Sequence, residues 1–80
     1  MARSRHITEA RDTNKSGFYL NRFLVEFRLA RDLSEANSLI RAGSVELNNS
    51  RIKDVQYHVE AEHTYDVKIN GDYVAEATLI

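Results

Sequence analysis

The sequence has no cysteine, no proline and only three glycines. Without cysteine there can be no disulfide and no thiolate metal ligand, so a reducing, cytoplasmic location is the natural expectation. Gly17, Gly43 and Gly71 are too widely spaced to form a glycine-rich phosphate-binding loop. No apolar run approaches the roughly 18 residues that would indicate a membrane span, so we expect no membrane partner.

Residues that carry catalysis or bind metals are also few and scattered. His6, His58 and His63 do not follow a helical ligand spacing. No nucleophile lies in a recognisable elbow or triad motif. A chain of 80 residues buries only about 60% of its unfolded surface, which leaves little room for a catalytic cavity. We therefore expect no metal site, no cofactor and no enzymatic activity from this chain by itself.

The charge is unevenly distributed along the chain. The formal net charge of -1 divides into +2 for residues 1–17, +2 for residues 18–53 and -5 for residues 54–80. A protein can bind a polyanion through a local basic patch even when its total charge is near zero. The alternative interpretation is an uneven surface charge that arose by chance.

The chain divides near residue 17. Residues 1–17 are polar and lack apolar periodicity, so we expect a flexible arm or a linker remnant there. Residues 18–80 are expected to form one domain. The initial methionine fits either a complete small protein or an expressed fragment.

Two helices are predicted after this boundary. Leu20, Phe23, Leu24 and Phe27 follow the i, i+3, i+4, i+7 spacing of one helix face, which predicts a helix that ends near Ala30. We expect Asn21 to cap its start.

The second helix has clearer end signals. Asp32 and Glu35 have the spacing of a capping box at its start. Its apolar stripe consists of Leu33, Ala36, Leu39 and Ile40. Gly43 occupies the position at which a glycine often ends a helix in the left-handed conformation.

Beyond Gly43 the apolar period falls to two, which is typical of strands. Asn48-Asn49 and Asn70-Gly71 predict tight turns. The alternating apolar positions are Val45 and Leu47, then Val55, Tyr57 and Val59, then Tyr65, Val67 and Ile69, and finally residues 73–79. The order predicts an α+β domain in which two helices pack on a small antiparallel sheet of four to five strands.

Two features of these strands have alternative interpretations. A two-residue turn at Asn70-Gly71 pairs Ile69 with Asp72, whereas a three-residue loop pairs Ile69 with Tyr73 and keeps charge off the apolar face. We prefer the longer loop. The three strand tyrosines could stack on bases, but we favour core packing for Tyr57, Tyr65 and Tyr73.

The order and motifs of residues 19–55 resemble the S-four-type RNA-binding domain. The matching segments are residues 20–26, 34–41, 42–49 and the pair Lys53-Asp54. The later segments 66–69 and 73–75, with Gly71 between them, are similar to the closing hairpin of the C-terminal domain of bacterial-type tyrosyl-tRNA synthetases. The resemblance implies an RNA-binding module whose partner is a structured RNA, expected to be tRNA. It also implies a separate catalytic domain if the chain is a fragment.

In that family the two helices and the following turn face the RNA, and basic side chains contact phosphates. Carried over by position, the candidate RNA-binding residues are Arg22, Arg31, Arg41, Asn48, Arg51 and Lys53. The chain departs from the family where Asn37 and Ser38 replace two arginines and where Asp72-Tyr73 replaces a basic pair. These departures motivate an alternative function, a protein-interaction or structural domain on the same scaffold.

Overall fold

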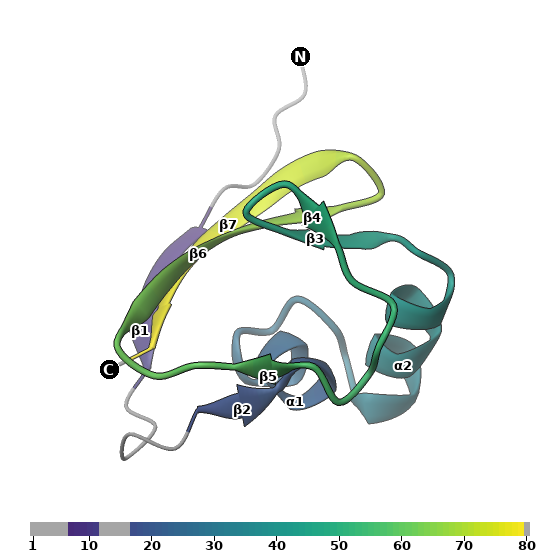
Figure 1. Ribbon diagram of the computed structural model, residues 1–80, viewed down its shortest axis with the longest axis horizontal. Helices are drawn as coiled ribbons and strands as arrows, with labels where there is room; N and C mark the ends of the chain where they lie inside the picture. Colours follow the sequence, from purple (N-terminus) through teal and green to yellow (C-terminus); the bar gives the residue numbers. More distant parts are fainter. Residues whose placement is uncertain (1–6, 12–16, 80) are drawn as a thin grey trace.

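A computed structural model describes residues 7–11 and 17–79 of the chain, and they form an α+β domain (Figure 1). Neither helix has the length and apolar character needed to cross a membrane. The elements found in these residues are β1 (Ile7–Arg11), β2 (Phe18–Tyr19), α1 (Leu20–Glu26), α2 (Leu33–Arg41), β3 (Val45–Leu47), β4 (Ser50–Arg51), β5 (His58–Val59), β6 (His63–Ile69) and β7 (Asp72–Leu79).

The described strands form a main sheet and a short ribbon. The main sheet has the order β1-β7-β6-β3-β4, and the ribbon pairs β2 with β5. The main sheet is curved, and α1, α2 and the ribbon lie across from its concave side (Figure 1). The two predicted helices and a small, mostly antiparallel sheet are therefore present.

Strand β1 was not predicted. We expected a flexible arm over residues 1–17, but Ile7–Arg11 pairs in parallel with β7, from Ile7 opposite Ala75 to Arg11 opposite Leu79. This segment has no apolar alternation, so its own sequence gives no signal for a strand. Its strand conformation depends on pairing with β7, which lies at the other end of the sequence. The rest of the expected arm, residues 1–6 and 12–16, lies outside the described residues.

The core lies between the helices and the concave face of the sheet. The predicted face of α1 is buried, and the ring of Phe23 packs 5.0 Å from Phe27 and 6.0 Å from Tyr65, centroid to centroid. Helix α2 contributes Ala36 and Ile40. The remaining buried apolar residues are Leu20, Leu24, Ala30, Val45, Leu47, Val59, Val67, Ala75, Ala77 and Leu79.

Core packing was the right interpretation for Tyr65 but the wrong one for Tyr57 and Tyr73, which are 40% and 39% exposed. The chain turns before Tyr57, whose N–H donates to the carbonyl of Asp54 at 3.0 Å. The Asp54 carboxylate also accepts from the Gln56 N–H at 2.9 Å. This aspartate turn shortens the predicted strand to His58–Val59.

Helix α1 begins and ends differently from the prediction. It begins at Leu20 without a side-chain cap, because the N–H groups of Leu20 and Asn21 donate to the carbonyls of Tyr57 and Val55 at 2.8 and 3.2 Å. Asn21 lies inside the first turn, where its side-chain oxygen accepts from the Arg22 N–H at 2.7 Å and its NH2 group donates to Asn37 of α2 at 2.9 Å. The helix ends at Glu26 rather than near Ala30, because Arg28 adopts the left-handed conformation with φ 59°.

The β6–β7 hairpin combines both registers that the sequence allowed. The two-residue turn pairs Ile69 with Asp72, so the preferred three-residue loop was wrong at the turn itself. A bulge on β7 then leaves Val74 without a partner, and Val67 pairs with Ala75 as expected. The bulge therefore allows a tight turn and still directs Val67 and Ala75 into the core.

Candidate nucleic-acid interface

Helix α2 is fixed at both ends as its sequence predicts. Its first-turn Glu35 N–H donates to the Asp32 carboxylate at 2.9 Å, and the Glu35 side chain accepts from the Arg31 N–H. At the other end, Gly43 adopts φ 77°, and its N–H donates to the Ile40 carbonyl at 3.0 Å. The next N–H, of Ser44, donates to Leu39 at 3.0 Å, which completes a Schellman motif.

The β3–β4 hairpin then brings two cationic side chains over this helix end. Asn48 and Asn49 have φ angles of 51° and 70°, which makes a tight two-residue turn between Leu47 and Ser50. The chain returns beside β3, and the Ile52 N–H donates to the Val45 carbonyl at 3.1 Å. Residues 51–53 therefore lie next to the end of α2.

Gly43 lies directly under these side chains. A Cβ atom at this position would be 3.1 Å from Lys53 Cε and 3.4 Å from Arg51 Cδ. Arg41, in the last turn of α2, is also exposed. We call Arg41, Arg51 and Lys53 the basic corner. Sequence reasoning predicted all three residues, and the structure shows that Gly43 is the residue over which two of them lie.

Acidic residues lie near the basic corner, because Glu46 is opposite Arg51 across the β3–β4 pair and Asp54 follows Lys53. Among the side chains that the structure describes, no carboxylate forms an ion pair with Arg41, Arg51 or Lys53. The carbonyl end of α2 carries partial negative charge, which favours cations at this position. The corner therefore presents exposed positive charge that a polyanion can contact.

Two other predicted arginines have contacts elsewhere. Arg22 forms an exposed ion pair with Glu26 at 3.2 Å, and its guanidinium lies 5.3 Å from the centre of the Phe18 ring. Arg31 is on the segment between the helices, with an 80% exposed side chain that lies 3.9 Å from Asp32. Neither has a contact that joins it to the basic corner.

Asn48 has a structural task in its hairpin. Its backbone N–H donates to the Asp66 carbonyl at 2.8 Å, and its side-chain oxygen accepts from the Asp66 N–H at 2.9 Å. These two bonds attach the turn to β6. A phosphate, which only accepts hydrogen bonds, would contact the side-chain NH2 group of Asn48 and not this oxygen.

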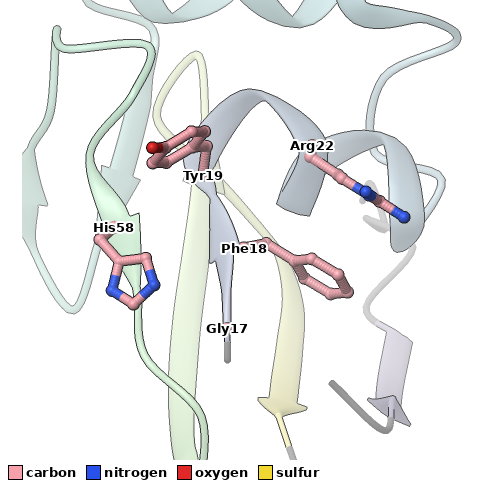
Figure 2. Close-up of a pocket in the computed structure, with 5 residues that line it drawn as sticks. All are labelled: Gly17, Phe18, Tyr19, Arg22 and His58. Atoms are coloured by element: carbon pink, nitrogen blue, oxygen red, sulfur yellow. The ribbon is translucent and has the colours of Figure 1, made fainter. Parts of the chain in front are cut away.

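Sequence reasoning missed a hollow of about 310 Å³ beside β2. It is lined by Gly17, Phe18, Tyr19, Arg22 and His58 (Figure 2). Of these, only Arg22 was a predicted site residue. The linear sequence carries no signal for the others, because the hollow forms only when β2 pairs with β5, which places Tyr19 opposite His58.

Desolvation is the largest cause of a raised pKa at two tyrosines, Tyr65 and Tyr73. Burial raises the pKa of Tyr65, whose hydroxyl accepts from the Glu60 N–H at 3.0 Å. Desolvation also raises the pKa of Tyr73, helped by its 3.0 Å hydrogen bond to Asp66 and by the charge of Glu76. Tyr73, Asp66 and Glu76 lie on the outer face of the sheet, opposite the face that carries the buried Val67, Ala75 and Ala77.

The described part of the chain contains no cluster of histidine, aspartate and glutamate that could hold a metal ion. In comparisons with known proteins, no family model and no curated protein sequence matches this chain.

Proposed function

We propose that this chain is an RNA-binding module that places its basic corner on the backbone of a structured RNA. The observation that carries the proposal is the convergence of Arg51 and Lys53 over Gly43, beside Arg41, with no ion pair between these cations and a described carboxylate. Arginine and lysine are the side chains that contact phosphates, and arginine can hold one phosphate through two hydrogen bonds.

In its more specific form, the proposal is that the module is of the S-four type and that the RNA is tRNA. The support is the resemblance of residues 19–55 and of the closing hairpin to the C-terminal domain of tyrosyl-tRNA synthetases. The order of α1, α2 and the β3–β4 hairpin fits that plan. In this role the chain holds tRNA in the cytoplasm and leaves the chemistry to a separate catalytic domain.

The proposed mechanism is electrostatic and reads shape rather than sequence. Each phosphate contact releases condensed counterions, so affinity falls as salt concentration rises. Contacts to the backbone position the RNA but carry no base information. The domain would therefore bind related structured RNAs with similar affinity.

The alternative function, a protein-interaction domain, is favoured by one observation. At the α2 positions where the family carries two arginines, Asn37 is occupied by its hydrogen bond to Asn21, and Ser38 has no charge. A protein partner would not require positive charge on this face of α2. The experiment below separates the two functions.

The test is a titration of the full chain with tRNA over a series of salt concentrations. We expect Arg41→Glu with Lys53→Glu to weaken binding at least about tenfold and to reduce the salt slope by about two. The matched control is Arg28→Glu with Lys68→Glu, which makes the same charge change outside the corner. Circular dichroism checks that both variants fold.

An equal loss of tRNA affinity in the two double variants would show that binding depends only on the total charge of the protein. That result would contradict the assignment of RNA binding to the basic corner. No binding by the unmodified chain at low salt would favour the protein-interaction alternative. Chemical-shift changes at residues 41–53 during an NMR titration would support the proposed interface.

A further inference from the structure

The hollow beside β2 has a chemistry that differs from that of the basic corner. Tyr19 is 53% exposed, the highest value among the large hydrophobic residues that the structure describes. Its ring lies edge-on to the His58 ring, with a centroid separation of 6.4 Å. An aromatic ring at the rim of a concavity can supply both apolar contact area and a polar group to a ligand.

The hollow has an aromatic side and a cationic side. In Figure 2, the rings of Tyr19 and His58 stand on one side of β2, and Phe18 and the Arg22 side chain stand on the other. The described residues that line the hollow include no carboxylate. A ligand with an aromatic part and an anionic part would meet complementary groups on both sides.

The guanidinium of Arg22 can turn to such a ligand at little cost. Its ion pair with Glu26 is exposed on both sides, with side chains 64% and 36% accessible. Exposed pairs at this helical spacing contribute little to stability, because water and salt screen them. A phosphate can therefore replace the Glu26 carboxylate as the partner of Arg22.

The walls of the hollow are held by the β2–β5 ribbon. Phe18 pairs with Val59 and Tyr19 with His58. A Cβ at Gly17, which has φ 74°, would lie 2.3 Å from the Val59 carbonyl oxygen and 3.1 Å from His58 Nε2. Only glycine allows this close approach of the two strands, so the hollow is a preformed feature of the fold.

We propose that this hollow binds one unpaired nucleotide, with the base against Tyr19 and the phosphate on Arg22. Its volume of about 310 Å³ lies at the small end of the range for ligand sites, which suits a single nucleotide. Aromatic stacking combined with an arginine is the general means by which proteins bind single-stranded nucleic acid. The nucleotide can be free or part of an RNA strand.

This inference extends the proposed RNA binding to a second site, so the probes must separate the two sites. Duplex RNA has no unpaired base and reports on the basic corner alone. Adenosine 5′-monophosphate reports on the hollow, and adenosine without phosphate isolates the base. Single-stranded pentaadenylate is followed at residues 17–22 and 58 alone, because its backbone can also contact the basic corner. If the shifts at these residues saturate at a lower concentration of pentaadenylate than of the mononucleotide, the nucleotide bound in the hollow belongs to an RNA strand and is not a free nucleotide.

The experiment is an NMR titration of the full chain with each probe. We expect saturable shifts at residues 17–22 and 58 with the mononucleotide, and weaker shifts with adenosine. Tyr19→Leu, which keeps the bulk of the side chain without an aromatic ring, should weaken mononucleotide binding about tenfold. Tyr19→Phe should retain it, and Tyr73→Leu serves as a control at another exposed tyrosine.

Each outcome has a defined meaning. Absence of saturable shifts with both the mononucleotide and pentaadenylate would overturn the inference. Equal losses in Tyr19→Leu and Tyr73→Leu would also overturn it, because a general change in the fold would then explain both. Binding of duplex RNA in either case leaves the proposed function in place, whereas failure with duplex RNA alone contradicts the proposed function and not this second site.

Discussion

The two helices end with the same hydrogen-bonding pattern but with different residues in the left-handed position. At the end of α1, the N–H groups of Arg28 and Leu29 donate to Val25 and Leu24 at 3.0 and 2.8 Å, and Arg28 has φ 59°. At the end of α2 the same position is Gly43. Because an arginine can occupy this conformation in the same fold, backbone strain alone does not explain the glycine.

The difference lies in what covers each helix end. A Cβ at residue 43 would crowd Lys53 Cε at 3.1 Å and Arg51 Cδ at 3.4 Å, whereas Arg28 is exposed. Gly43 therefore supplies space as well as a backbone angle, and that space lets two cations lie over the end of α2.

Gly43→Ala should have the largest effect, because it adds left-handed strain and displaces the Lys53 stem. We expect a loss of about 1–2 kcal/mol in the free energy of unfolding, measured with urea. RNA affinity should fall as well. Gly43→Asn separates the backbone strain from the displacement of Lys53, because asparagine tolerates the left-handed conformation but its Cβ still crowds Lys53. For this variant we expect a loss of RNA affinity without a large loss of stability.

Asp32→Ala should remove the cap at the other end of α2. The Asp32 carboxylate accepts the Glu35 N–H at 2.9 Å, and loss of such a cap costs about 1 kcal/mol. Urea unfolding measures the change, and Asp72→Ala, at an exposed hairpin position, is the control. A cost no larger than that of the control would show that the cap does not stabilise α2.

Arg28→Gly should change stability in the opposite direction. Glycine adopts φ 59° without steric cost, so we expect a gain of about 0.5 kcal/mol after its greater unfolded-state entropy is counted. A loss of stability on thermal unfolding would indicate that the arginine side chain stabilises the end of α1, and the comparison of the two helix ends would fail.

The smallest effect concerns the outer face of the sheet, which is the acidic counterpart of the basic corner. Desolvation, the Asp66 hydrogen bond and the charge of Glu76 all raise the pKa of Tyr73 above 10.0. The pKa of Tyr73 is higher in the folded than in the unfolded state. Its contribution to the free energy of unfolding is therefore fully present below about pH 10 and is lost as the pH rises through the folded-state pKa. Glu76→Gln should lower the pKa of Tyr73, measured by tyrosinate absorbance, and leave RNA affinity unchanged.

The sequence predicted those parts of the fold that depend on neighbouring residues. The caps of α2, the buried face of α1 and the turn at Asn48-Asn49 all follow from local rules about helix ends, periodicity and positive φ. Arg41, Arg51 and Lys53 were among the six candidate RNA-binding residues, and that role stays a prediction. Their arrangement around Gly43 was not predicted, because it requires the position of the returning hairpin.

The missed features depend on contacts between distant parts of the chain. Strand β1 and the β2–β5 ribbon are defined by partners far along the sequence, and strands of two residues have no readable period. The early end of α1 at Glu26 was missed because Arg28, not glycine, takes the left-handed position. The hollow at Tyr19 was missed for the same reason as the ribbon that forms it.

The bulge at Val74 separates the tip of the β6–β7 hairpin from its base. On the turn side of the bulge, Ile69 pairs with Asp72, as the two-residue turn requires. On the other side, Val67 pairs with Ala75, and both side chains are buried in the core. A Cβ at Gly71 would contact nothing within 4 Å. Peptide tags or reporter loops inserted between Asn70 and Gly71 should therefore leave the alignment of Val67 with Ala75 intact, which makes this tip a suitable attachment point for labels.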